Sequence, residues 1–361
     1  QEMCNLLAAL YKESTSGLIQ LVDRSLEETK LHKDFFLKAN PIEGDQQSIF
    51  GKLNIKLPNE NILTVVADLQ EWESEWLINS EKGFVYFPTP RSISSSSGDD
   101  DGSRERFSIT LNLSNENILY DSAELNYYTQ ETEQSQITVQ NQVSFFGGMQ
   151  APPTPTMRIR DFDFNQSIDG FSFEAYKSAG DYQMIYGLDI EDTETGRPRM
   201  LTEINLITGM ATNIVDGETY PNKTFPDSET KRKAVFFNNR FGLSDSSVLT
   251  IGFRYDDYEL NTSPDLLLSN ANILNYQISN TEDSAFTFKL GYLQDLSENL
   301  TGFVQYAEGF KAPNYETSNT VFTNYLDFYT VTPKPNLGSE ESDTIEVGLR
   351  GSGENDSWEL A

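Results

Sequence analysis

Cysteine and histidine are almost missing from this chain of 361 residues, which contains one cysteine, Cys4, and one histidine, His32. A single cysteine excludes an internal disulfide framework and a cysteine zinc cluster. A single histidine, distant from that cysteine, cannot complete a Ser-His-Asp or Cys-His catalytic site. We therefore expect a protein with no enzyme activity and no resident cofactor or metal, in which His32 is a surface residue.

Basic residues are also scarce. The chain has 26 Lys and Arg against 56 Asp and Glu, which gives a formal net charge of −30. Proteins that bind nucleic acid need Lys and Arg to neutralise phosphates, so this composition excludes nucleic acid as a partner. The surplus of carboxylates fits long acidic loops that face outward, and general solubility is the alternative explanation.

Long apolar runs and nucleotide-binding motifs are missing as well. No run of 18 apolar residues occurs, so we expect no transmembrane helix. The sequence has no G-x-x-x-x-G-K-[ST] loop and no G-x-G-x-x-G motif after a strand, which are the usual signatures of a phosphate-binding turn.

Short alternating runs rich in aromatic residues make up most of the chain, which has 17 Tyr and 23 Phe. Leu53, Ile55 and Leu57 alternate with polar residues, as expected for strands with one apolar face. In a β-barrel that face would contact lipid and the polar face a wet lumen, whereas in a β-sandwich it would face a core. The same alternation recurs at residues 107–113, 249–255, 286–292 and 345–349.

The connections favour the barrel. Pairs of runs meet at turns of three to five residues, such as residues 58–61, while long polar connections join one pair to the next. Short turns at one end and long loops at the other are typical of outer-membrane barrels, and loops this long are uncommon in compact soluble domains. The long connections are expected at about residues 79–103, 141–154, 191–230, 262–282 and 311–342.

These patterns predict an all-β protein, a transmembrane antiparallel up-and-down β-barrel. We expect an unclear segment at residues 1–44, with early barrel strands as one interpretation, followed by the barrel portion at residues 45–361. Roughly 13 to 15 strands are expected, fewer than the 22 of plugged transporters. The start of the chain lacks a signal peptide, which an exported barrel requires, so we expect a piece of a longer protein.

Two local features carry expectations of their own. Residues 92–102, SISSSSGDDDG, are a low-complexity stretch, which we interpret as a solvated acidic loop because its aspartates lack the spacing of an EF-hand.

Near Met157–Phe164 the alternation slips phase between Ile159 and Phe162, which predicts a β-bulge.

The most specific motifs lie near the end of the chain, in residues 306–316, YAEGFKAPNYE, and residues 329–351. They resemble the late strands and the intervening loop of TonB-dependent receptors, where a Y-x-x-G-F-[RK]-A-P box is followed by an N-P-N-L box. Lys334 replaces the first Asn of the second box. The matching residues are Phe310, Lys311, Ala312 and Pro313 in the first box, and Pro335, Asn336 and Leu337 in the second.

This resemblance covers most of residues 39–361. Within the family, the chain is similar to the haemoglobin and haem receptor branch. The resemblance implies a Gram-negative outer-membrane receptor that takes up an iron-bearing ligand, haem or a ferric siderophore. The implied partners are outer-membrane lipid and lipopolysaccharide, a haem protein or siderophore as ligand, and the TonB complex. TonB would act through a plug domain that the matched segment lacks.

The region between the boxes departs from that branch, which typically places a haem-ligating histidine there. Residues 314–333 contain no histidine but do contain Tyr315, Tyr325 and Tyr329. Tyrosine can ligate haem iron, so these are the candidate ligand contacts, with loop or girdle aromatics as the alternative. Lys311 is expected to meet an anionic ligand or lipopolysaccharide, or else to pair with Glu308 or a plug carboxylate.

Two other functions remain open on the sequence. One is a passive or adhesive outer-membrane barrel whose acidic loops bind a surface partner. The other is a soluble all-β carbohydrate-binding protein, which the alternating pattern alone also permits.

Overall fold

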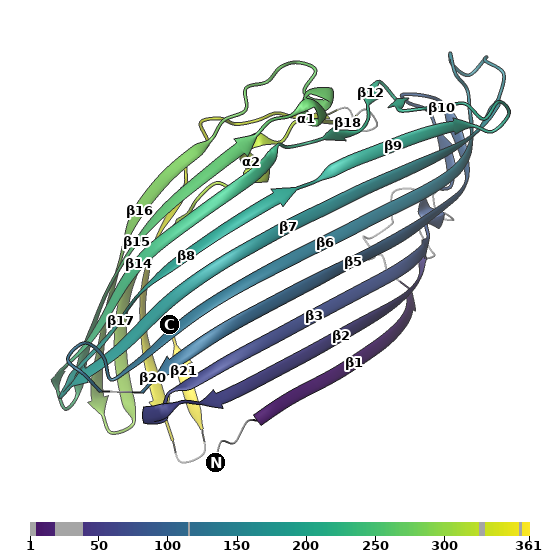
Figure 1. The fold of residues 1–361 in the computed structure, drawn as a ribbon. Coiled ribbons are helices and arrows are strands. Elements are labelled where there is room, and N and C mark those ends of the chain that lie inside the picture. The colour runs from purple at the N-terminus through teal and green to yellow at the C-terminus, as the bar shows by residue number, and fades with distance from the viewer. Residues whose placement is uncertain (1–4, 19–38, 115, 325–328, 354–355) are drawn as a thin grey trace.

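The computed structural model of the chain describes residues 5–18, 39–114, 116–324, 329–353 and 356–361 (Figure 1). Most of them belong to one curved antiparallel sheet in which each long strand pairs with the next along the chain. This up-and-down order is that of a barrel wall, as predicted. Cys4, His32 and Tyr325 lie outside the described residues.

The long strands form the wall, and short strands and helices lie in the connections. The wall consists of β1 (Asn5–Leu18), β2 (Pro41–Lys56), β3 (Ile62–Leu77), β5 (Arg91–Leu113), β6 (Ser122–Ser144), β7 (Thr154–Ala179), β8 (Tyr182–Gly196), β9 (Pro198–Asn205), β14 (Asp227–Ser244), β15 (Ser247–Ser263), β16 (Thr281–Ser297), β17 (Leu300–Lys311), β20 (Glu340–Ser352) and β21 (Ser357–Leu360). The connections contain η1 (Pro58–Glu60), η2 (Asn79–Glu81), β4 (Gly83–Val85), β10 (Ala211–Thr212), β11 (Ile214–Val215), β12 (Glu218–Thr219), β13 (Asn222–Lys223), α1 (Leu266–Ala271), α2 (Tyr315–Asn319), β18 (Phe322–Asn324) and β19 (Tyr329–Val331).

The strand number agrees with the prediction. The main sheet has 17 strand segments among the described residues, of which β4, β10 and β13 are only two or three residues long. β8 and β9 act as one strand, because β7 pairs with both in succession. The wall therefore has 13 strands, within the expected range.

The two ends of the wall differ as the barrel prediction requires. At the lower end in Figure 1 the turns are tight, such as the one between β7 and β8, where Gly180 has φ +61°. A positive φ suits glycine because it has no Cβ. At the upper end the connections are long, including residues 206–226, 264–280 and 312–339. The loops that could receive a ligand are therefore gathered at one end.

The outer face of the wall carries an apolar band. The strand registers place Ile109, Tyr127, Phe171 and Ile190 side by side across β5 to β8. Ile109 and Tyr127 are 49% and 46% exposed, which a water-facing sheet would avoid over so wide a surface. The band continues through Val235, Tyr255, Phe286, Val304 and Val347. None of the helices in the described residues is long and apolar enough to cross a membrane.

Residues 92–102 are not a loop, and that expectation is wrong. They lie inside β5, where Gly98 pairs with Trp76 of β3 and with Thr138 of β6. Ser, Gly and Asp have low strand propensity. Two long neighbouring strands nevertheless satisfy the backbone hydrogen bonds of this stretch on both sides, and this tertiary pairing outweighs local preference.

The predicted bulge near Met157–Phe164 is also wrong, because the register between β6 and β7 runs without a shift from Ser122↔Tyr176 to Ser144↔Thr154. The slip in alternation instead reflects side chains that suit the inner face. Arg158 and Phe162 both lie on that face, where they contact Glu203 and Arg199.

Candidate functional site

The first motif box ends β17 and begins the loop of residues 312–339. Phe310 and Lys311 are the last two residues of the strand. Pro313 has no amide hydrogen and cannot continue the ladder. Its carbonyl instead accepts a 2.6 Å hydrogen bond from the Tyr258 hydroxyl on the inner face of β15. The box therefore fixes the point at which the chain leaves the wall.

The second motif box is brought against the start of the same loop. The amide of Lys334 donates to the carbonyl of Ser318 (2.9 Å), and the amide of Leu337 donates to the carbonyl of Lys334 (3.0 Å). The carbonyl of Pro335 accepts a hydrogen bond from the Ser279 hydroxyl (3.4 Å) of the β15–β16 loop. The two boxes, separated by more than 20 residues of sequence, thus form the base of one loop.

Neighbouring loops hold this base from both sides. The Asn319 side chain, which is fully buried, accepts from the Ser279 amide and donates to the Ser279 carbonyl, both at 3.0 Å. The Val321 amide donates to the carbonyl of Thr224 at 2.6 Å. Buried polar groups need such partners, so these bonds give the base of the loop a defined position.

The candidate tyrosines occupy different environments. Tyr315 is half-buried and packs on Phe225, with ring centroids 5.1 Å apart. Burial, followed by the nearby Glu316 carboxylate, raises the pKa of Tyr315, which disfavours the phenolate that would ligate iron. Tyr329 is 48% exposed and meets Phe322 edge-on, with centroids 6.1 Å apart. Of the two described tyrosines, Tyr329 is the one available to a ligand.

Lys311 pairs with Glu340 across the β17–β20 ladder, with a closest N–O distance of 3.4 Å, and both side chains are largely exposed. The expected alternative of a pair with Glu308 is wrong, because residues three apart on a strand point to opposite faces. Glu308 instead accepts hydrogen bonds from the Phe288 amide and the Tyr306 hydroxyl.

A cavity of about 690 Å³ lies on the inner face, below the first box. Its walls carry charges of both signs: Arg254 lies 3.0 Å from Asp189 and from Asp256, and the Tyr128 hydroxyl donates to Glu191 at 2.6 Å. Such a polar inner wall suits a water-filled passage or contact with another polar surface. The cavity reaches Phe310, Lys311 and Ala312 of the first box.

A buried ion network anchors the loop of residues 206–226 to the inner face. Arg158 lies 2.7 Å from Glu203 of β9 and 2.8 Å from Asp216 of the loop, and Arg91 lies 3.6 Å from Asp216. The Arg158 and Glu203 side chains are 3% and 4% exposed. The sequence analysis missed this network, although the alternation of Arg158 and Arg160 in β7 was a signal for a charged inner face.

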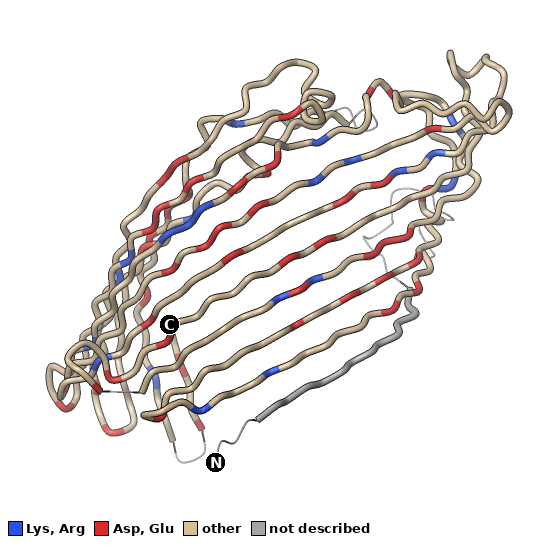
Figure 2. Tube along the Cα trace, in the orientation of Figure 1, with Lys and Arg blue, Asp and Glu red and all other residues tan. Residues whose placement is uncertain are grey.

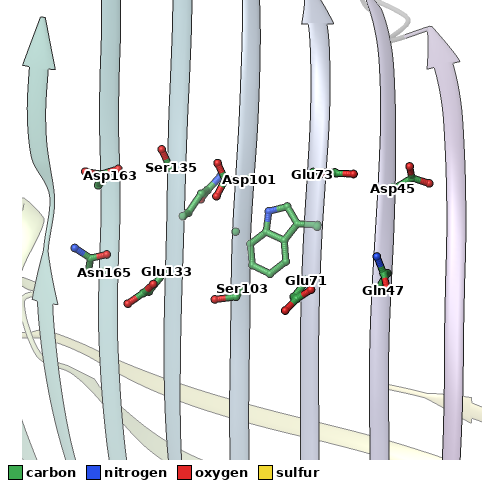
Figure 3. A pocket seen from close by; sticks show the side chains of 13 residues that line it. Asp45, Gln47, Glu71, Glu73, Asp101, Ser103, Glu133, Ser135, Asp163 and Asn165 are labelled. Atoms are coloured by element: carbon green, nitrogen blue, oxygen red, sulfur yellow. The ribbon is translucent and has the colours of Figure 1, made fainter.

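The surplus carboxylates lie largely on the strands rather than on the loops, as Figure 2 shows. The expectation of acidic loops is therefore wrong in its main point. Two rows of polar side chains cross the outer face of β2, β3, β5, β6 and β7, around a shallow depression of about 550 Å³ (Figure 3). The rows are Asp45, Glu73, Asp101, Ser135 and Asp163, and Gln47, Glu71, Ser103, Glu133 and Asn165.

Among the described residues, no group of three or more His, Cys, Asp and Glu side chains is placed to hold a metal ion. The site consists of an aromatic hairpin, of which strand β19 is exposed and β18 is partly buried, on a fixed base above a polar inner wall. This arrangement is suited to selective binding at the mouth of a passage.

Comparison with known proteins agrees with this geometry. The family model described as TonB dependent receptor-like, beta-barrel matches residues 52–361. The haemoglobin-haptoglobin utilization protein B of Neisseria meningitidis serogroup A is 28% identical over 141 residues, which are 37% of this chain and 17% of that protein.

Three solved structures share the fold. The copper transporter OprC aligns with a TM-score of 0.53 at 13% identity over 87% of this chain and 46% of its own. The Serratia marcescens hemophore receptor HasR, solved with its hemophore HasA and heme, aligns at 0.51 and 12% over 86% and 42%. The siderophore receptor PiuA of Acinetobacter baumannii aligns at 0.50 and 11% over 86% and 48%.

The chain spans less than half the length of each of these relatives. The family model, in contrast, covers most of the chain, and both motif boxes and the whole wall from β3 onward fall inside it. The chain therefore belongs to the TonB-dependent receptor-like β-barrel family.

Proposed function

We propose that this chain is the barrel portion of a Gram-negative outer-membrane receptor that actively imports an iron-bearing ligand, haem or a ferric siderophore. Energy reaches the receptor from the TonB complex through a plug domain. The receptor performs no covalent chemistry; it binds its ligand at the loop end and passes it along the polar inner wall.

The observation that carries this proposal is the loop between the two motif boxes. It presents the exposed ring of Tyr329 beside the partly buried ring of Phe322, on a base held by several hydrogen bonds. Flat ring systems are well bound by aromatic side chains, and haem and catecholate siderophores both contain them. The similarity to a haemoglobin-haptoglobin utilization protein favours haem.

The outer band supports a membrane position. Its apolar side chains, among them Ile109, Val235 and Phe286, are exposed and share the outer face of the wall, and lipid chains would cover them at no cost in desolvation. The wall extends above the band, where it would adjoin lipopolysaccharide. The adhesive barrel is the competing function, and it would have no need of TonB.

A growth experiment tests the proposal. The gene is deleted in its host, and the wild-type gene is then restored in two backgrounds, one with an active and one with a disabled TonB complex. The cells are grown with haem, haemoglobin or a ferric siderophore as the sole iron source. We expect restored growth on at least one source, only when TonB is active. Growth that is indifferent to the gene on every source would contradict the proposal.

The candidate contacts are tested in the same strain. We expect Tyr329→Ala to weaken binding and growth, because its ring is exposed in the loop. Tyr325→Ala is the companion variant. Tyr315→Phe should have little effect, since the packing on Phe225 needs the ring and not the hydroxyl. A strong loss with Tyr315→Phe and none with Tyr329→Ala would reverse this assignment.

A further inference from the structure

Arg199 has an unusual environment at the loop end of the inner face. It lies on β9, and its guanidinium carbon is 4.7 Å from the ring centre of Phe162, 5.7 Å from that of Tyr220 and 5.6 Å from that of Phe322. These rings come from three separate places: strand β7, the loop of residues 206–226 and the loop between the motif boxes. Arg199 thus joins two long loops to the wall.

The guanidinium lacks a carboxylate partner. Among the described residues Arg199 forms no ion pair within 4.0 Å, and its Nη1 is buried without a hydrogen-bond partner. The Glu218 carboxylate, close to Tyr220 in the chain, accepts hydrogen bonds from the Tyr220 hydroxyl (2.9 Å) and from the Asn222 side-chain amide (3.4 Å). Buried Arg158, in contrast, has two carboxylates.

An unpaired buried N–H group is costly, and aromatic faces compensate for it only in part. An anionic oxygen would bind the guanidinium edge through charge-assisted hydrogen bonds, which are stronger than a ring contact. Phe322 is the ring that an incoming group would most readily displace from the guanidinium, because it lies in a hairpin whose other strand is exposed.

We propose that Arg199 is a contact for an anionic group of the imported ligand, and that this group takes the place of Phe322 on the guanidinium. The inference rests on the proposed function and adds to it a ligand class: a molecule with a carboxylate or another anionic oxygen beside its ring system. The displaced ring, next to Tyr329, remains available to the flat part of the same ligand.

Binding of matched probes to the full receptor in isolated outer membranes tests this. One pair is haemin, which has two carboxylates, and its dimethyl ester, which has none. The other is an anionic ferric tris-catecholate and an uncharged ferric trishydroxamate. We expect the wild type to prefer the anionic member of the pair that it binds by roughly tenfold or more. Arg199→Met should abolish this preference, and Arg199→Lys should keep part of it.

Two control variants separate ligand contact from loop support. Phe322→Leu frees the guanidinium but also removes a ring, so affinity should change alike for both members of the pair, and the preference for the anionic probe should be kept or raised. Arg350→Met removes an arginine that also lies over a ring, 4.6 Å from Phe303, but is paired with Glu359 at the opposite end of the wall. It should leave the preference unchanged.

The outcomes are distinct. If the wild type binds a probe pair and Arg199→Met keeps the anionic preference, this inference is overturned while the receptor function stands. If Phe322→Leu loses the anionic preference as fully as Arg199→Met, Arg199 only supports the loops and the inference is likewise overturned. If the wild type binds no probe, the iron-ligand function fails and the inference fails with it.

Discussion

The hydroxyl of Tyr258, on the inner face of β15, donates a 2.6 Å hydrogen bond to the carbonyl of Pro313, the last residue of the first motif box. Both residues are buried. A strand in the middle of the wall thereby determines where the loop between β17 and β20 starts. The motif proline ends pairing with its own neighbours and gains a partner two strands away.

Removing this hydroxyl should loosen the base of the loop. Tyr258→Phe keeps the ring and leaves the Pro313 carbonyl buried without a donor, which costs roughly 1–3 kcal/mol. We expect faster hydrogen exchange in residues 314–321, measured by mass spectrometry on the receptor in detergent. Tyr255→Phe, on the outer face of the same strand, is the matched control and should leave these amides unchanged. Equal exchange in the two variants would refute the anchoring role.

A charge on the outer band should impair assembly. Phe253 lies on the outer face of β15 at 37% exposure, with Phe286 and Phe288 around it. Phe253→Arg should cost about 2–4 kcal/mol near the membrane midplane, and Ile251→Arg should act similarly. The readout is the fraction of heat-modifiable, folded receptor in outer membranes.

The control for that experiment is an arginine on the inner face. Gln305 lies there on β17 and hydrogen-bonds Glu346, so Gln305→Arg meets an acidic partner in a polar lumen and should assemble normally. If both arginines assemble equally well, the assignment of the outer face to lipid is wrong.

Arg158 should be the most sensitive position of the buried ion network. Arg158→Met would leave Glu203 and Asp216 buried without their main partner, and breaking such a pair costs roughly 3–5 kcal/mol. We expect a lower midpoint of thermal unfolding and protease sensitivity in residues 206–226. Glu203→Gln still accepts hydrogen bonds from Arg158 and should lose clearly less. A larger loss from Glu203→Gln would contradict this account.

The loop of residues 264–280 should loosen in acid. Burial alone would raise the pKa of Asp265, but hydrogen bonds from the Leu268 amide and Lys223 outweigh it, and the pKa is lowered. A lowered folded pKa means that the carboxylate stabilises the fold above its unfolded pKa of about 3.9. This stabilisation is lost as the pH falls through the folded value.

Hydrogen exchange of that loop between pH 7 and pH 3 measures the effect. The wild type should become less protected only in the acidic part of this range. Asp265→Asn should be less protected at neutral pH and nearly independent of pH, since its side chain does not titrate. A pH response in Asp265→Asn equal to that of the wild type would assign the transition to another group.

Much of the wall could be predicted from residue order alone. In runs such as Leu53, Ile55 and Leu57, a period of two fixes which side chains share a face, and pairing between consecutive strands follows from the short turns. The same reasoning failed for residues 92–102, because local propensity says little about a strand held by two long neighbours.

The candidate site could be located but not assembled. The two boxes identified the loop, and proline explained where β17 ends. The hydrogen bond from Lys334 to Ser318, the burial of Tyr315 against Phe225 and the choice of Glu340 rather than Glu308 as partner of Lys311 all depend on segments distant in sequence. No local pattern encodes such contacts.

The sequence by itself determined the class of the protein: alternation set the two faces, the turns set the strand order, and the motif boxes set the family resemblance. Only the tertiary structure decided what those faces carry. Curvature and register bring Arg199 of β9 against rings from β7 and two loops, and they place carboxylates on both the outer and the inner face of the wall. The physical reason is that alternation and short turns specify the pairing of consecutive strands. The neighbours of a side chain at the loop end of the wall depend instead on where several strands, distant in sequence, come to an end.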